Sequence, residues 1–184
     1  MKTRVVKELM VPLSEYATVP EEATLQDAVL ALRQTQMDNK KRKYLHRAIL
    51  VLDAKGAVTG KVSFLDVLRA LEPKYDQMLS SKKSLHVGFT PAFQRSMIEQ
   101  LKLWEAPMEH LCEKAAKLKV SSFMAAPVEA EIIESRRTLD EAIHQLVLGC
   151  HQSLLVTEDN AVVGILRLTD VFEVVADEIV KCEI

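Results

Sequence analysis

A serine and an aspartate stand three residues apart at the end of a short apolar run. Ser63 and Asp66 follow Gly60, and an apolar helical pattern begins beside them. The pair is therefore expected at the first turn of a helix, where unpaired backbone N–H groups and the positive end of the helix dipole favour an anion. There the serine hydroxyl can contact a phosphate, and the carboxylate can accept hydrogen bonds from two neighbouring ribose hydroxyls. The alternative is a capping box, in which the two side chains serve only the helix.

A second group with related spacing occurs in the last part of the sequence. Asp170 lies six residues after Gly164, as the first aspartate does after its glycine. Arg167, however, stands where the first group has a serine. The arginine can pair with Asp170 and fill a ligand-free pocket, or it can bind a phosphate through two hydrogen bonds. The sequence leaves both alternatives open.

These groups belong to a longer internal repeat. Residues 6–24 align without gaps with residues 120–138, and the match extends to the apolar runs that precede each glycine. Each copy reads as a strand, a helix capped by Thr24 or Thr138, two further strands joined by a turn, and a final helix. A unit of about 60 residues buries too little surface alone, so the two copies are expected to share a core.

Two segments have no counterpart in the repeat. Residues 38–43 include four successive cations, Lys40–Lys43, and are expected to form an exposed loop, with a phosphate or partner contact as the sharper alternative. Residues 73–119 are expected to form two amphipathic helices that pack on the repeats or on another subunit. The expected organisation is a first repeat over 1–72, a mostly helical insert over 73–119 and a second repeat over 120–184.

Composition limits the functional classes. The chain has 184 residues and a net charge of −2, which gives no reason to expect nucleic acid or an anionic membrane as a partner. It shows no long apolar run and no secretory signal, and its three cysteines are unpatterned, so a cytoplasmic protein with reduced thiols is expected. Known catalytic motifs and metal-ligand spacings are missing from the sequence, so we expect neither an enzyme nor a metal site.

Together the motifs resemble the CBS domain, named after cystathionine β-synthase. Gly60-x-Val62-Ser63-x-x-Asp66 closes a unit that begins with Ala17-Thr18-Val19-Pro20 and Thr24-Leu25-Gln26-Asp27-Ala28. The resemblance covers residues 6–71 and 120–180. It implies an α+β fold in which two βαββα repeats pair through their sheets, with the helical insert between them. It also implies a regulatory sensor that binds an adenine nucleotide, of the AMP, ADP or ATP type, in clefts between the repeats.

The resemblance further implies which residues of the first repeat contact the nucleotide. They lie on the first strand, which lines the adenine and ribose pocket, on the second strand, whose backbone contacts the base, and at the serine–aspartate group: Thr18 and Val19, Ala48 and Ile49, and Ser63 and Asp66.

In the second repeat the corresponding group consists of Arg167, Thr169 and Asp170. This repeat departs from the family pattern, because Arg167 replaces the usual serine or threonine and Ile132 stands in place of Thr18. The two sites are therefore expected to be unequal, with the first the stronger.

The protein expected from the sequence is a stand-alone nucleotide sensor that requires no cofactor. Its insert helices and the apolar face formed by Val171, Phe172, Val174 and Val175 predict a homodimer. The alternative is a ligand-free module that dimerises and docks another protein, and the regulated protein is left open.

Overall fold

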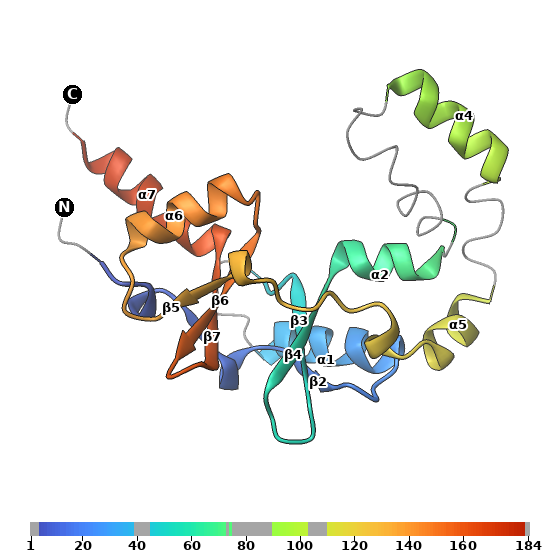
Figure 1. Ribbon diagram of the computed structural model, residues 1–184, viewed down its shortest axis with the longest axis horizontal. Coiled ribbons are helices and arrows are strands. Elements are labelled where there is room, and N and C mark those ends of the chain that lie inside the picture. Colours follow the sequence, from blue (N-terminus) through green and yellow to red (C-terminus); the bar gives the residue numbers. More distant parts are fainter. Residues whose placement is uncertain (1–3, 39–44, 73, 75–89, 103–109, 183–184) are drawn as a thin grey trace.

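The computed structural model describes residues 4–38, 45–72, 74, 90–102 and 110–182. Within these residues the chain has a mixed α+β fold, in which two repeats lie side by side (Figure 1). The basic loop predicted at Lys40–Lys43 lies outside the described residues.

The first repeat has the order βαββα. Its elements are β2 (Thr18–Pro20), α1 (Leu25–Asp38), β3 (Ala48–Leu52), β4 (Val58–Ser63) and α2 (Phe64–Leu71). β3 is the central strand, parallel to β2 and antiparallel to β4. On one face of the sheet, Ile49 and Val62 pack against α1, whose Ala28 and Leu32 are four residues apart on one helical face.

The second repeat has the same order. Its elements are β5 (Ile132–Glu134), α6 (Leu139–Leu148), β6 (Ser153–Glu158), β7 (Ala161–Arg167) and α7 (Leu168–Lys181). A short strand from the start of the chain, β1 (Val11–Pro12), extends this sheet to the order β1-β7-β6-β5. Short 3-10 helices precede β1, β2 and β5, at Val6–Glu8, Leu13–Glu15 and Glu129–Glu131, and another lies at Val120–Ser122. The last helix, α7, is longer than its counterpart α2.

The first helix of each repeat begins at the predicted cap. The Thr24 backbone N–H donates to Asp27 Oδ2 at 2.9 Å, and Thr138 N–H donates to Glu141 Oε2 at 2.8 Å. Each threonine hydroxyl in turn accepts a hydrogen bond from the backbone N–H of its acidic partner. The hydrogen bonds that the two carboxylates accept, from the threonine backbone N–H first and from the threonine hydroxyl second, hold the pKa values of Asp27 and Glu141 below their ordinary range.

The two sheets pack together through a shared apolar core. Its buried residues come from both repeats and from the start of the chain: Val11, Tyr16, Leu50, Leu155 and Ile165. The predicted fold class, two βαββα repeats paired through their sheets, is confirmed.

Each repeat is completed by the segment that precedes the other repeat, and we call residues 6–11 and 120–125 the lead-in segments. Val6 is buried in the core of the second repeat, and Val120 is buried in the core of the first. Val11 pairs with Ile165 on β7, and Ala125 exchanges two backbone hydrogen bonds of 2.9 Å with Lys61 on β4. The sequence did not show this exchange.

The exchange explains the glycine that both repeats contain. A Cβ atom at Gly164 would lie 2.6 Å from the backbone oxygen of Val11, and one at Gly60 would overlap the side chain of Met124. Only glycine lets the lead-in segments approach the sheets so closely.

The insert contributes the two predicted helices, α4 (Pro91–Leu101) and α5 (Leu111–Lys117). α5 packs against α1 and α2 of the first repeat, whereas α4 stands apart from both sheets (Figure 1). None of the helices within the described ranges has the length and apolar character that a membrane span requires.

Candidate functional site

Ser63 and Asp66 form a capping box at the start of α2. The Ser63 backbone N–H and hydroxyl both donate to Asp66 Oδ2, at 2.8 and 2.6 Å, and the Asp66 N–H donates back to Ser63 Oγ at 3.3 Å. The other carboxylate oxygen, Oδ1, has Arg69 Nη1 at 4.0 Å. Both side chains are half-buried. This geometry is the capping alternative, with one carboxylate oxygen outside the box.

The sheet brings two further predicted residues to the same end. Ala48 is the partner of Ser63 in the β3–β4 ladder, and Thr18 begins the neighbouring parallel strand. The side chains of Val19 and Ile49 point the other way, into the core of the first repeat. Any contact of these two residues with a ligand at this end of the sheet would have to come from their backbone.

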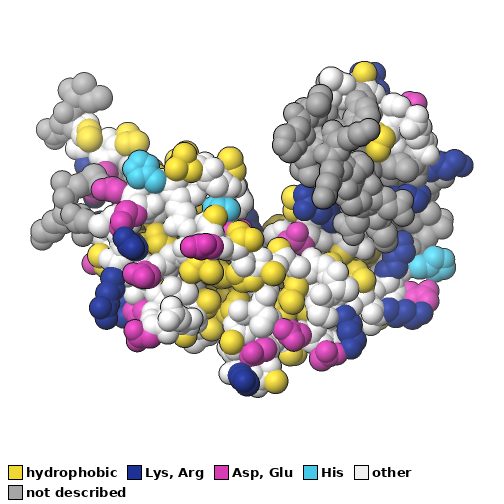
Figure 2. Space-filling view, in the orientation of Figure 1, with side chains coloured by type: hydrophobic (Ala, Val, Ile, Leu, Met, Phe, Trp, Pro, Cys, Tyr) yellow, Lys and Arg dark blue, Asp and Glu magenta, His cyan; other side chains and the backbone are white. Residues whose placement is uncertain are grey.

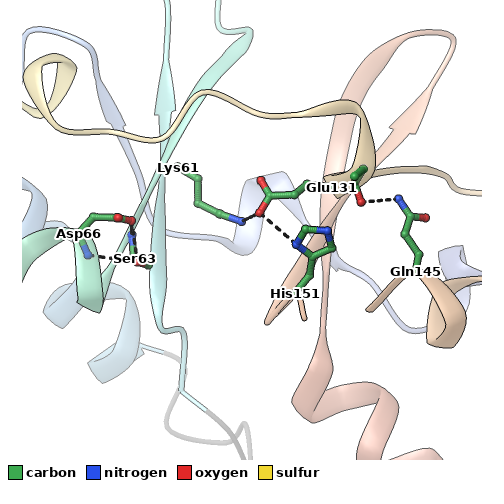
Figure 3. Close-up of polar contacts among 7 residues, drawn as sticks. Lys61, Ser63, Asp66, Glu131, Gln145 and His151 are labelled. Carbon is green, nitrogen blue, oxygen red and sulfur yellow. Dashed lines mark hydrogen bonds and ion pairs between the residues drawn. The ribbon is translucent and has the colours of Figure 1, made fainter. Parts of the chain in front are cut away.

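An ion pair crosses between the repeats beside this group. Lys61 Nζ on β4 lies 2.9 Å from Glu131 Oε1, which precedes β5, and the same oxygen lies 3.5 Å from His151 Nδ1 (Figure 3). The Lys61 and Glu131 side chains are only 13% and 17% exposed. We call Lys61, Ser63, Asp66, Glu131 and His151 together the first junction.

The segment that carries Glu131 is held in place by α6. Gln145 donates from Nε2 to the carbonyl oxygens of Ala130 and Ile132, at 2.8 and 2.9 Å (Figure 3). The backbone on both sides of Glu131 is therefore anchored to the second repeat.

In the second repeat the equivalent aspartate, Asp170, forms an ion pair with Arg167 instead of a capping box. Arg167 Nε donates to Asp170 Oδ2 at 2.6 Å, and Nη2 donates to Oδ1 at 2.5 Å. Arg167 is 6% exposed, so this two-pronged ion pair is largely withdrawn from water. Of the two alternatives for Arg167, the structure contains the first, an arginine that pairs with Asp170. Thr169 lies half-buried in the first turn of α7.

Two aromatic side chains of the first repeat lie near this ion pair. Tyr16 and His46 are both buried, and their rings meet edge-on with centroids 4.3 Å apart. Burial raises the pKa of Tyr16 to about 12, against smaller opposing effects of the Arg167 charge and a backbone hydrogen bond with Ala48. We call Tyr16, His46, Arg167 and Asp170 the second junction.

Sequence reasoning missed Lys61, Glu131 and Tyr16. A signal existed for Lys61, because it interrupts the apolar residues of its strand and aligns with Ile165 of the second repeat, which is fully buried. Ile132, which replaces Thr18, is partly exposed at the start of β5.

The molecular surface is largely apolar where the two repeats meet. Figure 2 shows hydrophobic side chains gathered over the strands between the repeats, with charged side chains towards the margins.

A separate open cavity of about 1030 Å³ lies on the second repeat, and none of the predicted site residues lines it. Among the charged residues that line it, Lys7 pairs with Glu158 at 2.7 Å and Arg137 pairs with Glu141 at 3.1 Å. We therefore place the candidate site at the first junction. Among the described residues no group of three or more acidic, histidine or cysteine side chains could hold a metal ion.

Comparison with known proteins gives a family match. The family model for the CBS domain matches residues 6–73 and 120–177. No curated protein matches the chain.

Solved structures give likenesses at low sequence identity. A CBS domain-containing protein of unknown function from Bacillus anthracis has a TM-score of 0.61 and 17% identity, over 95% of this chain and 94% of that one. The CBS-pair protein CBSX2 from Arabidopsis thaliana has a TM-score of 0.59 and 16% identity, over 98% and 100% of the two chains. A structure of CBSX2 in complex with AMP has a TM-score of 0.57 and 16% identity, over 95% and 97%. These likenesses concern the fold.

Proposed function

Since the chain belongs to the CBS domain family, we propose that it is a regulatory module that binds an adenine nucleotide at the first junction. The match of the family model to two copies, and the complex of CBSX2 with AMP, support this choice of ligand. The observation that carries it is the half-buried serine–aspartate group at the start of α2, which follows Lys61, the residue that pairs with Glu131 of the other repeat. We propose a binding module rather than an enzyme.

In this proposal the Asp66 carboxylate accepts hydrogen bonds from the ribose hydroxyls. Oδ1 is suited to this contact, because the capping box uses Oδ2 and the nearest cation to Oδ1, Arg69, is 4.0 Å away. Ser63 and the first backbone N–H groups of α2 would face the phosphate, where the helix dipole favours negative charge. Thr18 and Ala48 would border the base and ribose at the same end of the sheet.

We propose that the second junction holds no nucleotide. The Arg167 guanidinium already occupies both carboxylate oxygens of Asp170, so ribose hydroxyls would have to break two charge-assisted hydrogen bonds. The expected stoichiometry is therefore one nucleotide per chain.

A thermal-shift screen of adenosine, AMP, ADP and ATP tests the proposal. A ligand at 100 times its dissociation constant stabilises the folded state by about 2.7 kcal/mol. For a chain of this size that corresponds to about 5–10 °C. Asp66→Ala should remove the shift, measured against the variant's own unliganded melting temperature. Asp140→Ala is the control, because it removes an exposed carboxylate from the first turn of α6, away from the junction. No shift with any of these ligands contradicts the proposal.

A second function, dimerisation with docking of a partner protein, is favoured by exposed apolar helix faces. On α2 these are Phe64, Leu65 and Leu68, and on α7 they are Phe172, Val175 and Ile179. The α7 residues lie along one face of the helix, at spacings of three, four and seven residues, and on α2 Leu68 follows the adjacent Phe64 and Leu65 by four and three residues. Such faces are typical of contacts with another chain.

We propose that these faces form an isologous homodimer. Light scattering should give twice the chain mass of 20.7 kDa, and the double variant Leu65→Glu/Ile179→Glu should give the single mass. A wild-type chain that scatters as a monomer at micromolar concentration contradicts the dimer. Failure of nucleotide binding with an intact dimer would favour the docking function alone.

A further inference from the structure

The two junctions differ at equivalent positions of the repeat. Lys61 and Glu131 of the first junction align with Ile165 and Ala17, which are both buried apolar residues. The half-buried ion pair of the first junction therefore stands at two positions that hold buried apolar residues in the other copy. Because an apolar pair would serve packing at least as well, the ion pair calls for a role besides packing.

The geometry places the lysine beside the proposed nucleotide site. Lys61 and Ser63 are two residues apart on β4, so their side chains emerge on the same face of the sheet, with Cα atoms about 7 Å apart. Figure 3 shows Lys61 reaching from β4 towards Glu131, and it shows Ser63 and Asp66 at the end of the same strand, where α2 begins. The Lys61 ammonium group is therefore the positive charge of the first junction that can contact a phosphate beside Ser63.

The partner of Lys61 belongs to the other repeat. Glu131 is a monoanion at 2.9 Å from Lys61 Nζ, and it also has His151 Nδ1 at 3.5 Å. A nucleotide phosphate carries more charge than one carboxylate and offers more acceptor oxygens. A phosphate in the junction can therefore compete with Glu131 for the lysine.

We propose that Lys61 determines the specificity of the first junction for phosphorylated ligands, and that Glu131 holds this lysine when no ligand is bound. Phosphate binding transfers the lysine from Glu131 to the ligand and breaks the ion pair between the repeats. The module thereby distinguishes a nucleotide from its nucleoside. This inference rests on the proposed function, because it assumes that the nucleoside part binds at Asp66.

Calorimetric titration with adenosine and AMP tests the inference on four proteins. These are the wild type, Lys61→Met, Glu131→Gln and the control Lys7→Met, which also removes a lysine from a lysine–glutamate pair but lies at the cavity of the second repeat. Lys61→Met should weaken AMP about ten-fold and leave adenosine unchanged, since a hydrogen bond to a charged group is lost only with the phosphate. Glu131→Gln should strengthen AMP and leave adenosine unchanged. Lys7→Met should alter neither.

The outcomes separate the two proposals. If Lys61→Met changes the affinities of adenosine and AMP by the same factor, Lys61 only supports the fold and the inference is wrong, while the proposed function stands. If Glu131→Gln weakens AMP, Glu131 positions the lysine rather than competing for it, and the transfer is refuted. If the wild type binds neither ligand, the proposed function fails and the inference fails with it.

Discussion

The Arg167–Asp170 ion pair allows a quantitative test of the second junction. Two hydrogen bonds of 2.6 and 2.5 Å join these side chains, and the arginine is nearly inaccessible to water. Removal of one partner of a buried ion pair costs about 3–5 kcal/mol, because the other charge stays buried without compensation. Since the Asp170 side chain is 20% exposed, we expect the lower part of this range when only Arg167 is removed.

A double-mutant cycle measures this coupling. Arg167→Met should lower the free energy of unfolding by about 3 kcal/mol and Asp170→Ala by about 3–5 kcal/mol, whereas the double variant should lose much less than their sum. The expected coupling energy is about 2–3 kcal/mol, obtained from urea unfolding followed by circular dichroism.

The exposed pair Glu113–Lys117 supplies the control for this cycle. Its atoms are 2.6 Å apart, but the side chains are 57% and 74% exposed, so its coupling should stay below about 0.5 kcal/mol. If the Arg167–Asp170 cycle is additive within the same limit, the ion pair does not lock the second junction, and our reason for an empty second site is wrong.

Three further predictions follow from the same contacts. Gly164→Ala should destabilise the protein by about 1–3 kcal/mol in urea unfolding, and more than Gly60→Ala, because its Cβ meets the Val11 backbone rather than a movable methionine side chain. Burial raises the pKa of Tyr16 to about 12 from an ordinary value near 10. Relative to high pH, this shift contributes roughly 2–3 kcal/mol to the free energy of unfolding below pH 10, and the contribution is lost between pH 10 and 12. Tyr16→Phe should therefore flatten the pH dependence of the free energy of unfolding in that range. Arg167→Ser should raise the number of nucleotides bound per chain, measured by equilibrium dialysis, from one towards two.

Much of the fold could be predicted because its signals are local. The caps at Thr24 and Thr138 depend on a residue three positions away, and the apolar faces of the helices depend on neighbours within two turns. The serine–aspartate group at α2 could be placed for the same reason, since its geometry is set within the first turn of one helix.

The exchange of lead-in segments could not be predicted in this way. An alignment of the two copies shows that Val6 corresponds to Val120, but it does not show that each packs in the opposite repeat. The same limit applies to Lys61 and Glu131, which are 70 residues apart in the sequence and meet only when the repeats pair. Whether Arg167 pairs with Asp170 or binds a phosphate likewise depends on the surroundings that the fold creates.

The central claim, one adenine nucleotide per chain bound at the first junction, is tested most directly by isothermal titration calorimetry of AMP. We predict a stoichiometry of one for the wild type. Asp66→Ala should weaken binding at least about ten-fold, because charge-assisted hydrogen bonds are worth about 1.5–3 kcal/mol. Asp170→Ala should bind with nearly unchanged affinity once its folding is verified. Loss of binding in Asp170→Ala, with binding intact in Asp66→Ala, would contradict the account and make Arg167 the phosphate contact of the working site.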